Sequence, residues 1–470
     1  MLEVFNIIIN PEILLSLVVL CLVLHGIRLP ILKLSVIVLF LIGIITGFNL
    51  AGLDSFETIT IIKYSYITNG LLDTNNWIII SKFIIIIGSI SILLMGISET
   101  ILIKSYQYFS LLILILTLGA LLLVSSINWL SIYLVIELQT LILFILTALK
   151  RDSAYGTEAA LKYFILGALS SSLFLFGCGL LYGLVGETSV QGINSILTID
   201  VGKILITISL LFKLAAAPFH MWAPDVYEGA PTIITALLAT VPKVGIFSIL
   251  VQIGPVINVI LISAVLSIIY GAIGALNQTK IKRLLAYSGI GHMGFILLGV
   301  AIDTFESIQA SLIYIIIYII ITICSFTIIL SLNLTKNLII EISGLSGDNP
   351  VIAATLALTL FSVAGIPPLA GFLSKLLILL SGVLNGYYLI TIIAVISSVI
   401  AGVYYVRLVH LIYFPINYSI LIWQNILIKQ RNINLSKSIL IGITFYIILF
   451  LIITPNFLLQ ISHNAVISLY

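Results

Sequence analysis

Charge is scarce in this chain. Asp, Glu, Lys and Arg make up 8% of the 470 residues, whereas 61% are hydrophobic, and the mean hydropathy is +1.31. A soluble domain has about 25% charged and about 45–50% apolar residues. The composition therefore excludes a soluble globular protein and indicates an integral membrane protein. The net charge of +3 is too small to favour a nucleic-acid partner.

Cysteine is also rare. The three cysteines, Cys21, Cys178 and Cys324, are spread through apolar segments, and no C-x-x-C pair occurs. This spacing gives no support to a disulfide framework, a zinc site or an iron–sulfur cluster. The marks of a signal peptide are missing too, because residues 1–30 have no basic leading stretch and no small-residue cleavage site. We therefore expect the first apolar run to remain as a membrane span.

Long apolar runs dominate what is present. A membrane-spanning helix needs about 20 predominantly apolar residues, and this criterion predicts an all-α polytopic membrane protein with about fourteen spans. The predicted spans cover residues 11–29, 30–50, 78–100, 105–125, 127–149, 156–183, 201–228, 231–250, 255–276, 284–302, 307–333, 349–382, 386–414 and 438–460.

The charges between the predicted spans are segregated. Loops after odd-numbered spans contain most of the lysines and arginines, among them Lys150 and Arg151, whereas loops after even-numbered spans contain mostly acids, among them Asp54 and Glu57. The positive-inside rule then places the odd loops on the cytoplasmic or matrix side and both termini on the opposite side. This segregation supports an even number of spans.

An internal repeat divides the chain. The sequence LFKLAAAP at 211–218 resembles LFSVAGIP at 360–367, 149 residues later. About five spans separate the copies, and an odd number inverts one copy relative to the other. Proline removes a backbone donor and disrupts a helix, so we predict a broken helix in each repeat, as in many transporter folds. The interrupting residues are Pro218, Pro224, Gly365, Pro367, Pro368 and Gly371.

The repeat suggests four segments. We expect an N-terminal three-span segment at 1–104 with a polar loop at 51–77, a first repeat at 105–250, a second and inverted repeat at 251–414, and a C-terminal loop and span at 415–470.

Four charged residues lie deep inside predicted spans: Glu137, Lys213, Lys243 and Lys375. A charge at the bilayer centre costs about 2.5–3.5 kcal/mol on insertion scales, so such residues are functional candidates. A buried lysine can exchange a proton, and the proton affinity of a buried carboxylate depends on nearby charges. The pattern indicates a route for protons or cations. A static ion pair, neutralisation of carbonyls freed by the helix breaks, and a lysine that reaches the interface are the alternatives.

Three further residues are weaker candidates for proton transfer: Lys162, His292 and Lys282. Lys162 lies near the start of a span and could anchor it at the interface. His292 titrates in a useful range, although a lone histidine often serves packing. Lys282 lies at a span edge among other basic residues, which is typical of a topology signal.

Two other sequence features have simpler interpretations. Asp225 and Glu228, with His220, are expected to line or cap the end of the first broken helix. The sequence GIGHMG at 289–294 matches G-x-G-x-x-G, but a dinucleotide fingerprint follows a strand. Inside a membrane span, these glycines favour close helix packing instead.

Several stretches around these residues are similar to a known family. They are YLVIELQTL, GTEAALKYFILGALSSSLFLFG, LFKLAAAPFHMWAPDVYEGAPT, ATVPKVGIF, NQTKIKRLLAYSGIGHMGF and GIPPLAGFLSKL. On these stretches, the chain resembles the antiporter-like membrane subunits of proton-pumping NADH:ubiquinone oxidoreductase (complex I), which are related to multi-subunit cation/proton antiporters. EAALKYF and YSGIGHMGF favour the subunit 2 branch, and a lysine at 375 argues against subunit 4.

The resemblance implies two inverted five-helix bundles, spans 4–8 and 9–13, and a hydrophilic axis through the membrane midplane. It implies that Glu137 faces Lys213, that Lys243 connects the bundles, and that Lys375 opens the exit or interface side. It also implies that this chain holds no cofactor or metal, and that NADH, FMN, iron–sulfur clusters and ubiquinone bind to other subunits. The implied partners are other complex I membrane subunits, including a neighbouring antiporter-like subunit, accessory subunits and membrane lipids.

The expected location is the mitochondrial inner membrane, with both termini facing the intermembrane space. Isoleucine outnumbers alanine, which is typical of an AT-rich genome such as a mitochondrial one, and a bacterial plasma membrane is the alternative. Two other functions remain open. A subunit of a stand-alone cation/proton antiporter would share the charged positions, and a purely structural membrane subunit would use them as assembly contacts.

Overall fold

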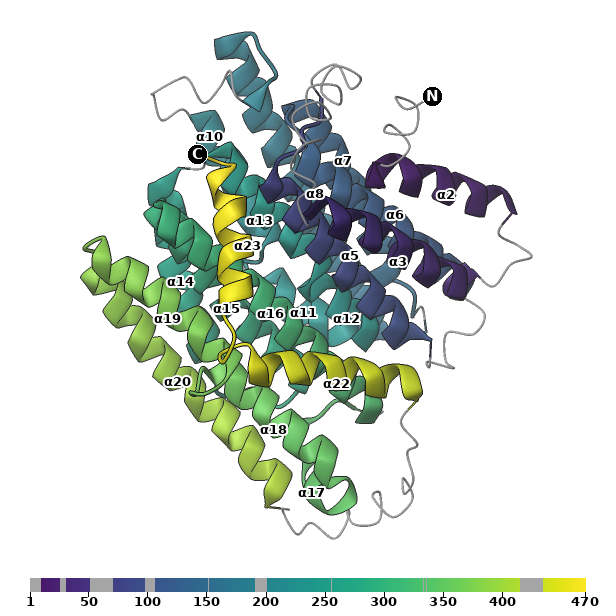
Figure 1. Ribbon diagram of the computed structural model, residues 1–470, viewed down its shortest axis with the longest axis vertical. Helices are drawn as coiled ribbons and strands as arrows, with labels where there is room; N and C mark the ends of the chain where they lie inside the picture. The colour runs from purple at the N-terminus through teal and green to yellow at the C-terminus, as the bar shows by residue number, and fades with distance from the viewer. Residues whose placement is uncertain are drawn as a thin grey trace. The chain divides into compact units, whose positions relative to one another are not determined.

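The structure is a computed structural model that consists of helices joined by short turns (Figure 1). It describes residues 10–25, 31–50, 71–97, 106–150, 152–190, 201–254, 256–332, 334, 336–414 and 434–470. Most of the predicted polar loop at 51–77 lies outside the described residues, as do several loop charges used for the predicted topology, among them Asp54, Glu57 and Arg151.

The helices account for the predicted spans. Ten helices of the described residues are long and apolar enough to cross a membrane. The other four predicted spans correspond to the shorter α2 (Pro11–His25) and α22 (Leu435–Phe450) and to two interrupted segments, α10 followed by α11 and α18 followed by α19. The all-α architecture with about fourteen spans is therefore confirmed, and the chain is a multi-pass membrane protein.

The described residues form two compact units. The first comprises Met1–Leu214, Leu237–Ile260 and Gln460–Tyr470. Within it, α8 packs against α7 and α10, α6 packs against α5 and α7, and α13 packs against α5, α6 and α10. Its helices are α2, α3 (Ile31–Leu50), α5 (Asn76–Gly96), α6 (Tyr106–Ser125), α7 (Trp129–Thr147), α8 (Ala154–Val185), α10 (Val201–Lys213) and α13 (Val241–Ile253).

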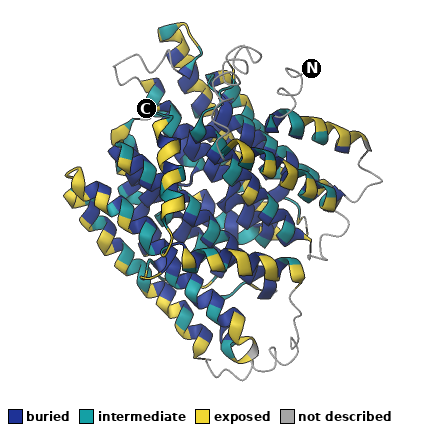
Figure 2. Ribbon diagram, viewed as in Figure 1, coloured by how far each residue is buried: buried dark blue, intermediate teal, exposed yellow. Residues whose placement is uncertain are grey.

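The second unit comprises Ala215–Ala236 and Leu261–Leu459. Its central helix, α16, is buried along almost its whole length and packs against α15, α18, α19 and α22, whereas α20 exposes one face (Figure 2). Its helices are α11 (Trp222–Gly229), α15 (Ile281–Ile302), α16 (Phe305–Leu332), η2 (Ile339–Ile342), α17 (Leu345–Asp348), α18 (Pro350–Ala364), α19 (Ala370–Leu384), α20 (Tyr388–Tyr413) and α22. Three helices cross the boundary between the units: α12 (Thr232–Ala239), α14 (Ile257–Ala275) and α23 (Asn456–Ile467).

Both predicted helix breaks are present. In the first, α10 ends at Lys213, and the chain turns through Ala215, which has a φ of 59°, before α11 begins at Trp222. In the second, α18 ends at Ala364, Gly365 takes the left-handed conformation with a φ of 88°, and α19 begins at Ala370.

Two of the proline and glycine positions do not lie in the turns themselves. Pro224 lies in the first turn of α11, and Gly371 lies in the first turn of α19. A proline fits the first turn of a helix because the N–H groups there have no intrahelical acceptor.

Two predicted spans differ from the structure. The span at 231–250 is divided at Thr240 into α12 and α13, and Pro242 lies in the first turn of α13, where its missing N–H is tolerated. The prediction of a single helix at 438–460 is wrong, because α22 ends at Phe450 and α23 begins at Asn456, just after Pro455. The residue before a proline disfavours the α-helical conformation, which explains the interruption.

Candidate functional site

Lys213 is the last residue of α10 in the first unit. Its Nζ atom is buried and has no hydrogen-bond partner among the described residues. The C-terminal end of a helix carries partial negative charge, which favours a cation there. The lysine is therefore placed where its charge is stabilised by the helix, without being fixed to a particular acceptor.

Glu137 lies in the middle of α7 in the same unit and is half-buried. Thr140 donates a hydrogen bond of 2.9 Å from Oγ1 to the Glu137 carbonyl oxygen, and the same hydroxyl lies 3.5 Å from Oε2 of Glu137. Among the described residues, no direct ion pair joins Glu137 to Lys213, although the carboxylate acts electrostatically on the lysine. Both α7 and α10 pack against α8, which places the two charged residues on helices that share a neighbour.

Lys243 lies in the first turn of α13, also in the first unit, and is 4% exposed. Because α13 continues to Ile253, ten residues of helix follow the lysine rather than the seven predicted from a span that ended at 250. Such a position makes it harder for the side chain to reach the interface than the sequence suggested.

Lys375 lies in α19 of the second unit and is 7% exposed. Its Nζ donates hydrogen bonds to the carbonyl oxygens of Val363 at 3.1 Å and Ala364 at 2.7 Å, the last two residues of α18. Helix ends leave four carbonyls without intrahelical donors, and Lys375 satisfies two of them. Its ammonium also lies 5.7 Å from the ring centroid of Phe295.

A small cavity adjoins Lys375 and His292 in the second unit. It measures about 20 Å³, which is room for a water molecule. Its polar lining includes Ser288, Ser397 and Tyr405. His292 Nδ1 lies 2.8 Å from the hydroxyl of Tyr314 in a hydrogen bond, so a fixed partner orients the ring.

Lys282 is buried rather than exposed at a span edge. It is 5% exposed, and its Nζ donates a hydrogen bond of 2.8 Å to the carbonyl of Ala230, the residue that caps the end of α11. Its charge therefore stabilises the C-terminus of the second half-helix.

Charged residues beside Lys282 connect α11 to α15. Glu228 of α11 forms ion pairs with Lys280 and with Arg283, the latter at 3.2 Å, and Asp225 lies 3.5 Å from Arg283. His220, in the turn before α11, stacks on Tyr270. Asp225 and Glu228 were expected to line or cap the end of the broken helix. In the structure, they form ion pairs that hold α11 against α15.

Lys162 has a different environment. It forms a 2.7 Å ion pair with Glu158, one helical turn earlier on α8, and the two side chains are 41% and 58% exposed. Lys162 is thus more exposed than Lys243 and Lys375.

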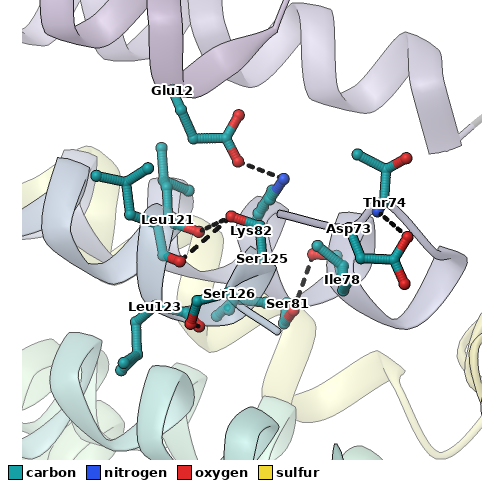
Figure 3. Close-up of polar contacts among 12 residues, drawn as sticks. Glu12, Asp73, Thr74, Ile78, Ser81, Lys82, Leu121, Leu123, Ser125 and Ser126 are labelled. Atoms are coloured by element: carbon teal, nitrogen blue, oxygen red, sulfur yellow. Dashed lines mark hydrogen bonds and ion pairs between the residues drawn. The ribbon is translucent and has the colours of Figure 1, made fainter. Parts of the chain in front are cut away.

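Two further lysines are buried in the structure, although the sequence did not single them out as candidates. Lys82 on α5 forms a buried ion pair with Glu12 on α2 (Figure 3). Lys437, assigned to a loop, lies in the first turn of α22, is 4% exposed and donates to the Leu330 carbonyl at 3.3 Å. Lys82 could have been found, because it falls inside the predicted span 78–100.

Comparison with known proteins identifies a matching family and several relatives. The model of the transmembrane family described as NADH:quinone oxidoreductase/Mrp antiporter matches residues 126–401. A protein of Metridium senile named NADH-ubiquinone oxidoreductase chain 2 is 59% identical over 372 residues, which cover 76% of this chain and 97% of that protein. The protein of the same name from Marchantia polymorpha is 40% identical over 76% of each chain.

The chain belongs to the NADH:quinone oxidoreductase/Mrp antiporter family of membrane subunits. The predicted resemblance is therefore confirmed, including its subunit 2 branch, since the relatives in Metridium and Marchantia are named chain 2.

Two solved structures share the fold of this chain. A chain of respiratory complex I from Thermus thermophilus superposes with a TM-score of 0.81 at 25% identity and covers 96% of this chain and 99% of its own length. A chain of the archaeal membrane-bound sulfane sulfur reductase superposes with a TM-score of 0.85 at 21% identity, over 99% of this chain and 97% of its own. The second likeness concerns the fold alone.

Proposed function

We propose that this chain is a proton-translocating membrane subunit of NADH:ubiquinone oxidoreductase, located in the mitochondrial inner membrane. Its relatives are named as subunits of that enzyme. The observation that carries the proposal is Lys213, whose buried ammonium has no hydrogen-bond partner among the described residues and lies under the electrostatic influence of Glu137. Intramembrane charges of this kind mark proton pathways in pumps and transporters.

In this proposal, the interaction between Glu137 and Lys213 in the first unit is the step that responds to a change of charge elsewhere in the complex. Because Glu137 and Lys213 are not in direct contact, a shift of charge elsewhere in the complex changes their interaction without breaking an ion pair. The proton released from Lys213 passes through water to Lys243, which is buried in the same unit. The energy comes from electron transfer between NADH and ubiquinone in other subunits, which bind the FMN and the iron–sulfur clusters.

The second unit provides the exit. Lys375 and His292 border one water-sized cavity, and its hydroxyl-bearing lining can conduct a proton between them. We propose that Lys375 exchanges the proton there with the neighbouring antiporter-like subunit. Lys162 and Lys282 have no step in this scheme, because the first lies in an exposed pair and the second caps α11.

A stand-alone cation/proton antiporter is the second candidate. The family model includes Mrp antiporters, and a chain of the Mrp complex from Dietzia has the same fold, with a TM-score of 0.79 at 18% identity. The buried charges serve both functions, so the partner proteins decide between them.

The test is the complex in which the chain resides. Source membranes are solubilised gently, intact complexes are separated on a native gel and stained for NADH dehydrogenase activity, and the chain is located by mass spectrometry. We expect it in a very large NADH-oxidising complex. Its presence only in a smaller complex without NADH activity would contradict the proposal and would favour the antiporter.

A further inference from the structure

A second buried pair of opposite charges lies in the three N-terminal helices, outside the residues assigned above. Glu12 on α2 points towards Lys82 on α5, and the two form an ion pair whose side chains are each 4% exposed (Figure 3). Lys82 lies about 9 Å along α5 from Asn76, at 1.5 Å per residue. The pair is therefore buried between the helices, with Glu12 in the first turn of α2 and Lys82 near the start of α5.

The carboxylate of this pair is poorly satisfied. Apart from the ion pair itself, neither oxygen of Glu12 has a hydrogen-bond partner among the described residues. A buried ion pair compensates for lost hydration only when further hydrogen bonds satisfy the remaining lone pairs. Replacing a buried ion pair with well-packed apolar side chains of similar volume is often neutral or stabilising, so a buried pair is weak evidence for a stabilising role.

The helices around the pair contribute few other charges. Lys33 on α3 is exposed, and α6, which packs against α2, α3 and α5, contains no charged residue. α2 ends at His25, whose side chain lies outside the described residues. Among the described residues, the ion pair that Glu12 forms is the one with Lys82.

The pair is also one helix away from the proposed proton pathway. α5 packs against α13, the helix of Lys243, in the same unit. Hydroxyl groups join the two helices beside Lys82, because Ser81 and Ser248 lie 3.5 Å apart and the Trp77 indole donates to Ser248 at 3.0 Å. A polar connection thus links the N-terminal helices to the helix that carries a proposed relay lysine.

We propose that Glu12 and Lys82 form an additional proton-exchange site that takes part in pumping. The proton leaves Nζ of Lys82 and binds a carboxylate oxygen of Glu12, which leaves a neutral amine and a neutral carboxylic acid. Glu12 then releases this proton to water, and the Nζ of Lys82 takes another proton from water, which restores the ion pair. Because uptake at Lys82 accompanies release at Glu12, the pair stays neutral overall and avoids an uncompensated buried charge, which is the costly state. This inference rests on the proposed pumping function.

The decisive variant is Lys82→Arg. An arginine keeps the positive charge and the ion pair but is not deprotonated in proteins. A purely structural pair tolerates this change, whereas a proton-exchange site does not. The paired substitution Glu12→Leu with Lys82→Met removes both charges at similar volume and serves as the second variant. Lys33→Met, which removes an exposed lysine from the adjacent α3, is the matched control.

The measurement is the number of protons moved per NADH oxidised by the assembled complex in sealed membrane vesicles. We expect assembled complexes with a reduced ratio for Lys82→Arg and for the paired variant, and an unchanged ratio for Lys33→Met. An unchanged ratio in either assembled charge-pair variant overturns the proposal. Failure of both variants to assemble also overturns it, since the pair would then be a structural requirement.

Lys213→Met in the same assay separates this inference from the proposed function. If Lys213→Met loses pumping while both charge-pair variants keep it, only the N-terminal site is wrong. If Lys213→Met pumps normally, the proposed function itself fails.

Discussion

The two broken helices differ in how each uses its lysine. In the first break, Lys213 ends α10, and its ammonium has no hydrogen-bond partner among the described residues. In the second, Lys375 reaches back from α19 and donates to the carbonyls of Val363 and Ala364 at the end of α18. One lysine is held by the main chain and the other is not, although both belong to copies of one repeat.

The sequence repeat explains how the difference arises. In the alignment of the two copies, Lys213 corresponds to Ser362, so the lysines occupy different half-helices. A change of protonation at Lys213 breaks no protein hydrogen bond, whereas loss of the proton from Lys375 weakens two charge-assisted bonds, which are about twice as strong as neutral ones. Under the proposed function, we therefore expect the more mobile proton at Lys213 and a partly structural role for Lys375.

The largest expected effect concerns Gly371 in the second break. A Cβ atom added there would overlap the carbonyl oxygen of Ser362, so Gly371→Ala forces α19 away from α18. Forced overpacking of this kind costs about 1–3 kcal/mol or more. We expect little or no assembled complex on a native gel.

Gly402→Ala is the matched control, because a Cβ at that position of α20 meets nothing within 4 Å. It should leave assembly unchanged. The first break has Trp222 where the second has Gly371, so this close approach belongs to the second break alone. Normal assembly of Gly371→Ala would contradict the tight contact between α18 and α19.

The next effect is that of Lys375→Met. The substitution leaves the carbonyls of Val363 and Ala364 without their lysine donor, at a cost of about 1–3 kcal/mol for each unsatisfied group. We expect a lower thermal stability of the isolated complex, together with reduced pumping. Lys213→Met removes no hydrogen bond and should leave the thermal midpoint close to that of the wild type. If Lys375→Met and Lys213→Met lowered the thermal midpoint equally, the two lysines would not differ in how they stabilise the helix breaks.

The sequence predicted the breaks but not how they are capped. Prolines and glycines in apolar spans indicated both interruptions, because proline removes a donor and glycine accepts positive φ. Which lysine satisfies which carbonyl depends on how one half-helix lies against another. For the same reason, the sequence placed Lys282 at a span edge but did not show that packing of α15 against α11 buries it against the Ala230 carbonyl.

The buried pair of Glu12 and Lys82 shows the same limit. Lys82 was visible inside an apolar span, but its partner is 70 residues earlier, on α2. Periodicity and propensity report contacts within one helix, whereas this contact joins two. Tertiary packing alone reveals it.

The smallest expected effect is that of Lys162→Met. The residue forms an exposed pair with Glu158 within one helix, and such pairs contribute about 0.3–0.5 kcal/mol. We expect assembly and the ratio of protons moved per NADH oxidised to stay within error of the wild type. A strong loss of pumping in this variant would place Lys162 in the pathway and would show that burial alone does not identify the proton-carrying lysines.

The most direct test of the contrast is the number of protons moved per NADH oxidised by an assembled Lys213→Met complex. Because Lys213 is buried and no described residue forms a hydrogen bond with its ammonium, the substitution should leave assembly intact and sharply lower the ratio. An assembled Lys213→Met complex that moves as many protons per NADH as the wild type would contradict the assignment of Lys213 as the proton-carrying lysine.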